Sequence, residues 1–144
     1  MYVGDSLACC FVETFGRLDT PAATTVRSVS EAQLHDVCIA EIASIRPLTL
    51  VDLTGPGLRR IGADTRLIAG NYSESQWWGR AIWAHPIQPD GILYPARRDP
   101  SLQSVALFDR AQDAVLAGAT HPLSTLDDAE LAVLLDRYNF SLRP

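Results

Sequence analysis

The 144-residue sequence has few cysteines and no long apolar run. Three cysteines are an odd number, and Cys9 and Cys10 are adjacent within an apolar segment, so we expect free thiols in a reducing compartment. No window approaches the ~20 consecutive apolar residues of a membrane span, and no basic segment precedes the first apolar stretch as in a secretion signal. We therefore expect a cytoplasmic protein that does not enter membranes.

Basic residues are also few, and they are scattered. Twelve Lys and Arg stand against seventeen Asp and Glu, for a net charge of −5, and no basic run exceeds the pairs Arg59-Arg60 and Arg97-Arg98. We therefore expect no direct nucleic-acid partner. A hydrophobic content of 47% in a chain of this length indicates one globular domain with its own core, spanning residues 1–144.

Three common site motifs are missing. His35, Cys38, His85 and His121 are scattered and lack the close pairs of zinc sites, so we expect no metal. No Gly-x-Ser-x-Gly segment is present to mark a nucleophilic serine. The segment Thr-Gly-Pro-Gly at 54–57 lacks the lysine and the spacing of a phosphate-binding loop, so it is interpreted as a turn that leads into a helix.

The first predicted helix spans residues 6–15, with a cap at Asp5 or Ser6 and an end at Gly16. Glu13 is the one charge between Asp5 and Arg17 in this apolar helix. Such a carboxylate can act as a general base or as an electrostatic stabiliser with a shifted pKa. Alternatively, it lies at the edge of the core, bonded to a backbone group.

The middle of the chain combines loops, strands and short helices. Residues 18–30 are rich in Asp, Thr, Pro and Ser, including Pro21, Thr24 and Thr25, and predict a loop. Residues 30–42 fit a helical turn and a strand about equally well. Residues 48–53 predict a central strand, and 57–61 and 65–69 predict short helical segments.

A capping box of Ser73 and Gln76 predicts a longer helix that is stopped by Pro86. Trp77 and Trp78 share its apolar face with Ala81 and Ile82, and one of the two tryptophans is free to stack on a nucleobase or a nicotinamide ring while the other packs in the core.

Strands are predicted at 92–94 and 104–108, on either side of a polar loop at 97–103, with a third short strand at 114–117. Thr125 and Asp128 are predicted to cap a last helix. Its apolar face comprises Leu131, Leu134, Leu135 and Tyr138. Strands mixed with short helices at irregular spacing indicate the α+β class, here a small mixed, mostly antiparallel sheet flanked by short helices.

Three stretches together resemble the RES domain family, which is named for its Arg, Glu and Ser. They are YVGDSLACCFVE at 2–13, LTLVDLT at 48–54, and DGILYPAR at 90–97 leading to VALFD at 105–109. The helix that contains Gln76 and Trp77, before the third stretch, also fits this family pattern.

The resemblance implies a fold similar to that of ADP-ribosyltransferase toxins and an activity that consumes NAD⁺ as substrate, with no separate cofactor. Family members act by hydrolysis, phosphorolysis or transfer of ADP-ribose to a protein, and a cognate antitoxin silences them. By resemblance, Tyr2 and Glu13 are the catalytic residues. The residues expected to bind NAD⁺ are Tyr94, Ala96, Arg97 and Trp77.

The sequence departs from the family pattern in two places. The family's Arg lies upstream of the position of Tyr2, in a segment that we expect this chain to lack, and the family's Ser is replaced by Ala96. Arg97 or Arg98 could substitute for the missing cation. Two alternatives stay open: a catalytically degenerate RES fold that binds NAD⁺ or an antitoxin, and an α+β domain unconnected with NAD⁺. A homodimer through an apolar face is a further expectation.

Overall fold

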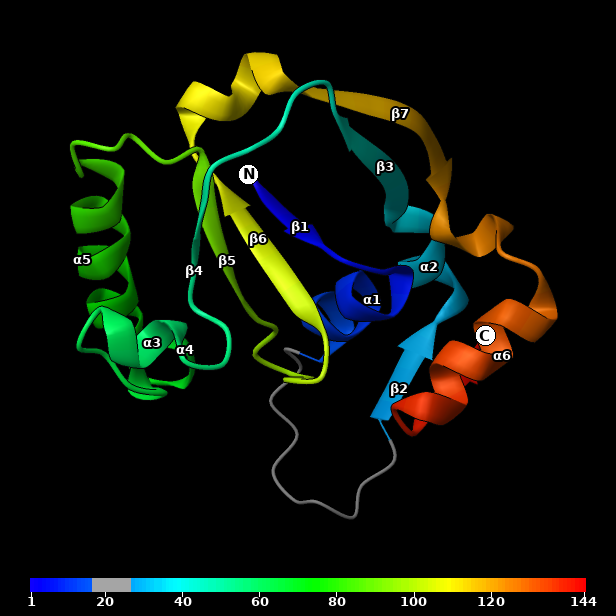
Figure 1. Ribbon diagram of the computed structural model, residues 1–144. Coiled ribbons are helices and arrows are strands. Elements are labelled where there is room, and N and C mark those ends of the chain that lie inside the picture. The colour runs from blue at the N-terminus through cyan, green and yellow to red at the C-terminus, as the bar shows by residue number, and fades with distance from the viewer. Residues whose placement is uncertain (17–26) are drawn as a thin grey trace.

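A computed structural model describes residues 1–16 and 27–144 (Figure 1). Its main sheet is mixed and has the strand order β1-β6-β5-β4, in which β1 pairs with β6 and β6 with β5 antiparallel, and β5 with β4 parallel. The predicted α+β class is therefore confirmed. The four strands are β1 (Tyr2–Gly4), β6 (Gln103–Leu107), β5 (Gly91–Pro95) and β4 (Leu50–Asp52).

The strand predicted as central lies at the edge of this sheet, so that prediction is wrong in its position. β4 pairs with β5 alone among the described strands. The apolar character of the segment has another cause, because Val51 and Leu53 pack in a hydrophobic cluster with Leu58, Leu67 and Ile82 from the helices that follow. Those helices form the crossover that a parallel strand pair requires.

The crossover contains α3 (Gly57–Arg60), α4 (Arg66–Ala69) and α5 (Tyr72–Trp83). The predicted capping box at Ser73 is wrong. Asn71 is the N-cap of α5, and its side-chain oxygen accepts a hydrogen bond from the backbone N–H of Ser73. Asn caps helices as well as Ser does, so a Ser two residues later lies within the first turn.

The first helix, α1 (Leu7–Phe15), begins and ends as predicted. The hydroxyl of Ser6 accepts a hydrogen bond from the backbone N–H of Cys9, and Gly16 follows the last turn. A side chain at Gly4 would meet the Cβ of Cys9 at 3.0 Å and the thiol of Cys10 at 2.8 Å. Glycine at this position therefore lets α1 lie directly against β1.

The segment that fits both a helix and a strand contains one of each. Ser30 and Gln33 form a capping box at α2 (Glu31–Asp36), and β3 (Cys38–Ser44) follows. β3 pairs antiparallel with β7 (Val115–Pro122), which is longer than the predicted strand at 114–117. In the predicted loop, Arg27–Ser30 forms strand β2, whereas Pro21, Thr24 and Thr25 lie outside the described residues.

The C-terminal segment returns to strand β2. α6 (Asp128–Arg137) is capped by Asp127, which lies between the predicted caps Thr125 and Asp128, because the Asp127 carboxylate accepts the N–H of Glu130. β8 (Phe140–Arg143) then pairs parallel with β2. Short 3₁₀ segments, η1 (Asp109–Ala114) and η2 (Leu123–Thr125), flank β7. No helix in the described ranges is long and apolar enough to cross a membrane.

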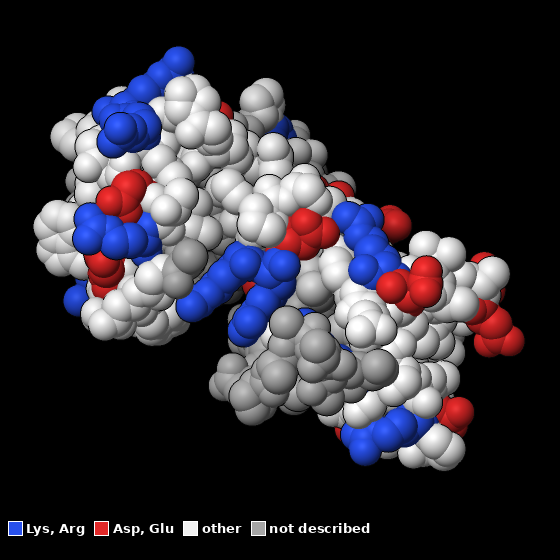
Figure 2. All heavy atoms as spheres, turned by 90° about the horizontal axis from the view of Figure 1, so that it is seen from below, with Lys and Arg blue, Asp and Glu red and all other residues white. Residues whose placement is uncertain are grey.

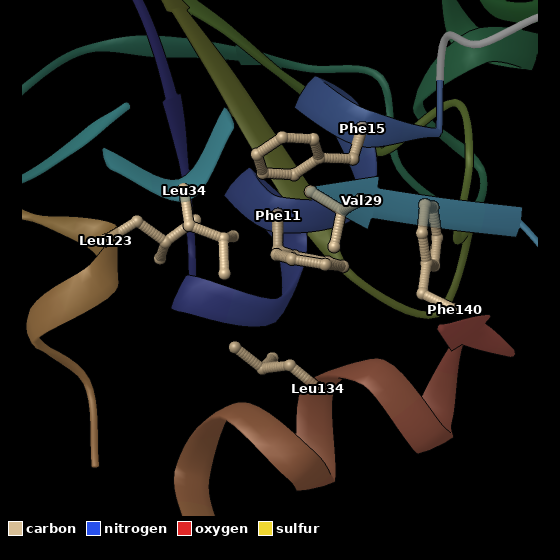
Figure 3. Close-up of a cluster of buried hydrophobic side chains, with 7 residues drawn as sticks. All are labelled: Phe11, Phe15, Val29, Leu34, Leu123, Leu134 and Phe140. Carbon is tan, nitrogen blue, oxygen red and sulfur yellow. The ribbon is translucent and has the colours of Figure 1, made fainter. Parts of the chain in front are cut away.

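Two hydrophobic clusters lie on opposite sides of the molecule. One joins the face of α1 to α6 and to the β2–β8 pair (Figure 3), and Phe11 lies at its centre, in ring contact with Phe15 and Phe140. The other lies where α3, α4 and α5 approach the main sheet, on the side away from α6 (Figure 1). The face of the sheet between α1 and α5 is left accessible.

Candidate active site

The floor of a cleft of about 680 Å³ is formed by one face of the main sheet. Alternate residues of a strand point to the same face, and the register aligns two rows across three strands. The first row is Tyr2, Ala106 and Ile92, and the second is Gly4, Ser104 and Tyr94. All six residues line the cleft. The sheet therefore brings Tyr2 and Tyr94, which are distant in sequence, into one site.

Helices form the two walls. α1 contributes Cys9, Cys10, Glu13 and Thr14 on one side. On the other side, the lining residues of α5 recur at helical spacing. They are Tyr72, Ser75, Gln76, Trp78, Gly79, Arg80, Ile82 and Trp83.

Glu13 is half-buried where α1 borders the cleft. Its Oε1 atom accepts a hydrogen bond of 2.7 Å from the backbone N–H of Arg98, in the loop after β5. Within the described parts of the chain, no hydrogen bond reaches Oε2. The carboxylate is thus bonded to a backbone group, and it also faces a cavity that can hold a ligand.

Uncharged polar groups lie near Glu13 in the cleft. Burial, together with the nearby Tyr2 and Glu13, raises the pKa of Tyr94 to about 12, so its phenol stays protonated at neutral pH. Burial likewise raises the pKa of Cys9, whose sulfur lies 3.4 Å from the hydroxyl of Ser104. The Tyr94 phenol can donate a hydrogen bond to a ligand without adding charge.

Two arginines line the cleft, Arg80 on α5 and Arg97 in the loop after β5. A guanidinium binds a phosphate or a carboxylate through paired N–H donors, so either residue can hold an anionic group of a ligand. On the face shown in Figure 2, basic side chains form separate groups with acidic side chains beside several of them, rather than one continuous basic surface.

The structure brings together four of the six predicted site residues: Tyr2, Glu13, Tyr94 and Arg97. The other two lie elsewhere. Trp77 is 64% exposed and is not a lining residue, whereas its neighbour Trp78 is. Ala96 is fully buried and is not a lining residue, and its backbone N–H donates to the carbonyl of Leu102.

Sequence reasoning missed Arg80 and did not single out Ser104 as a site residue. The signal for Arg80 was its position four residues, or one helical turn, after Gln76, which also lines the cleft. Ser104 could have been found only through its cross-strand pairing with Tyr94, because the sequence does not give the register. Over the described residues, no three His, Cys, Asp or Glu side chains are grouped to hold a metal ion.

Comparisons with known proteins agree with the sequence resemblance. The chain is 33% identical over 112 residues to a protein of Sinorhizobium fredii (strain NBRC 101917 / NGR234) named "Probable toxin y4kH", and this covers 77% of the chain and 87% of that protein. No solved structure matches. The family model described as the RES domain matches residues 1–132. With nearly the whole chain matched, the protein belongs to the RES domain family.

Proposed function

We propose that this protein is a toxin-like enzyme that cleaves NAD⁺ at the bond between nicotinamide and ribose. The observation that carries the proposal is that one cleft holds a carboxylate, Glu13, together with two phenols and two arginines. The resemblance to RES toxins and the name of the Sinorhizobium fredii protein point in the same direction.

The chemistry requires groups of these kinds. As the bond from the ribose carbon to the nicotinamide nitrogen breaks, its electron pair leaves with nicotinamide and positive charge develops on the ribose. Glu13 stabilises that charge from the wall of the cleft. Arg97 and Arg80 hold the pyrophosphate, and Tyr2 contacts the nicotinamide side. An oxygen of water, phosphate or a protein side chain then bonds to the ribose carbon.

A second candidate function is a binding module that holds NAD⁺ without turning it over. Two observations favour it: Ala96 supplies no hydroxyl and is fully buried, and one oxygen of Glu13 is already bonded to the loop after β5. A missing hydrogen-bond donor removes transition-state stabilisation, and each loss of ~1.4 kcal/mol slows the reaction tenfold.

Partners follow from the same proposal. A toxin that depletes NAD⁺ requires a cognate antitoxin protein, which we expect to bind this chain and silence it. A homodimer also remains a proposal. The absence of nucleic-acid and membrane partners stays a prediction.

The decisive experiment measures nicotinamide release from NAD⁺ by the purified chain, with and without phosphate. We expect Glu13→Gln to lower kcat by about 100-fold or more, because it removes the charge that faces the ribose. Glu41→Gln is the matched control, since Glu41 is exposed on β3, outside the cleft lining. Release that is equal in wild type and Glu13→Gln would show that Glu13 has no catalytic role. No release, with NAD⁺ still bound, would support the binding module.

A further inference from the structure

The loop that carries Arg97 and Arg98 is attached to the end of α6 through Asp99. One carboxylate oxygen of Asp99, Oδ1, accepts hydrogen bonds from the backbone N–H and the hydroxyl of Ser101, which closes the loop on itself. The other, Oδ2, accepts hydrogen bonds of 3.0 Å from both the Tyr138 hydroxyl and the Arg137 guanidinium. Asp99 therefore links two segments separated by almost forty residues.

The same loop contacts the proposed reaction centre. Arg97 lines the cleft, and the backbone N–H of Arg98 is donated to Oε1 of Glu13. Arg98, whose N–H bonds to Glu13, directly precedes Asp99 in the chain, and Arg97 lies one residue before Arg98. A change in how Asp99 is held therefore reaches Arg97 and the N–H that bonds to Glu13, while α1 itself stays in place.

Tyr138 is itself fixed by packing. Its ring stacks on Phe11 of α1 at 6.4 Å and 17°, and the Arg137 guanidinium lies 5.3 Å from the Tyr138 ring centroid. The Ser101 hydroxyl, and after it Tyr138 and Arg137, lower the pKa of Asp99 to about 2, so its carboxylate stays charged at neutral pH. The side chain of Asp99 is 18% exposed, so these bonds are only partly screened by solvent.

We propose that Asp99 is a positioning residue, which with Tyr138 and Arg137 sets the loop that places Arg97 against NAD⁺ and braces Glu13. This inference rests on the proposed cleavage of NAD⁺. It also assigns a role to the end of α6, because Arg137 and Tyr138 lie beyond residues 1–132, the part of the chain that the RES family model matches. The C-terminal segment would then complete a site whose other residues lie within the family domain.

The test uses the 144-residue chain and three variants. Asp99→Asn keeps the size of the side chain but removes its charge. Tyr138→Phe keeps the ring on Phe11 but removes the hydroxyl that donates to Asp99. It replaces Asp99→Asn as the test variant if Asp99→Asn folds poorly. Asp136→Asn is the control, because it makes the same chemical change at an exposed position of α6 with no side-chain hydrogen bond to the described residues.

Two measurements are made on each variant. In Asp99→Asn, the KM for NAD⁺ should rise about tenfold while kcat changes less than about twofold, since Arg97 binds the substrate and α1 still carries Glu13. A merely structural role would instead lower the active fraction and leave KM unchanged. The second measurement is hydrogen exchange of the Arg98 amide, which should be at least about tenfold faster in Asp99→Asn, somewhat faster in Tyr138→Phe and unchanged in Asp136→Asn.

The two measurements separate the two proposals. If the wild type releases no nicotinamide, the proposed function fails, and the exchange of the Arg98 amide still tests the positioning role. Exchange in Asp99→Asn equal to that of the wild type would overturn the positioning role. So would an unchanged KM in an active Asp99→Asn enzyme.

Discussion

At the scale of single residues, Glu13 and Arg97 have opposite charges, and one is on a helix while the other is in a loop. Glu13 extends from the last turns of an apolar helix and is half-buried, whereas Arg97 is exposed in a loop. A carboxylate next to apolar side chains has a stronger field than one in water, and an exposed guanidinium can reach a phosphate with little rearrangement. The pair therefore suits the proposed substrate, in which positive charge develops on the ribose next to nicotinamide and the pyrophosphate follows that ribose.

Replacing Arg97 tests that assignment. In Arg97→Ala, kcat/KM for NAD⁺ should fall about 10- to 100-fold, the range expected for losing one hydrogen bond between charged groups. Arg80→Ala, measured in parallel, shows whether the arginine on α5 shares the phosphate contact. Arg143→Ala removes an exposed arginine of β8 outside the cleft lining and should leave kcat/KM unchanged. Full activity in Arg97→Ala would assign the phosphate contact to another residue.

At the scale of elements, an ion pair holds the start of β5 next to the segment before β4. Arg46 contacts both carboxylate oxygens of Asp90, at 2.6 and 2.9 Å, and the backbone N–H of Thr49 donates to Oδ2 of Asp90 at 2.8 Å. The hydrogen bonds from Arg46 are the main reason that the pKa of Asp90 falls from 3.8 to about 2. Because the Asp90 side chain is only 9% exposed, water cannot easily replace these partners.

The ion pair predicts a pH dependence of stability. A carboxylate whose pKa is lower in the folded state contributes stability above its unfolded pKa, so the contribution is complete above about pH 4 and is lost as pH falls towards 2. Asp90→Asn should lower the free energy of unfolding at pH 7 by about 1–3 kcal/mol and flatten its decline below pH 4.

Urea unfolding at pH 7, 4 and 3 measures this effect. Asp64→Asn is the control, because the Asp64–Arg66 pair is exposed and solvent screens it, so its loss should change stability little. Parallel pH curves for wild type and Asp90→Asn would contradict the prediction.

At the scale of the whole molecule, the cleft lies between two hydrophobic clusters. α1 packs into one cluster through Phe11 and Phe15, while α5 packs into the other through Ile82. Trp78, Tyr94 and Ala106 belong to the margin of the second cluster and also line the cleft, so the apolar surface of the cleft is continuous with a core. A ligand that fills the cleft contacts both halves and should stabilise the folded chain.

Thermal unfolding with NAD⁺ measures this stabilisation. At 100 times its Kd, NAD⁺ should stabilise the protein by about 2.7 kcal/mol and raise Tm by roughly 5–10 °C. Gly79→Leu should abolish the shift, because Gly79 lines the cleft and a Cβ there meets no atom within 4 Å, so the leucine fits and occupies the space. A Tm unaffected by NAD⁺ in the wild type would exclude both the enzyme and the binding module.

The sequence by itself determined the class of the fold and most of its local elements. Ser6, Gly16 and the apolar residues between them specify α1, because caps and helical periodicity act over a few residues. Local sequence patterns likewise predicted the strands β5 and β6 and the polar loop between them. Resemblance then singled out Tyr2, Glu13, Tyr94 and Arg97, which the structure brings into one cleft.

Only the tertiary structure decided which residues meet. The strand order places β4 at an edge of the sheet, and the register aligns Ser104 with Tyr94. The hydrophobic pattern of a single segment encodes neither the strand order nor the register. The rotation of α5 placed Trp78 and Arg80 in the cleft and left Trp77 in solvent. The contacts of Asp99 with Tyr138, and of Glu13 with Arg98, join segments distant in sequence. Such contacts follow from packing of the whole chain, since local propensity carries no information about long-range partners.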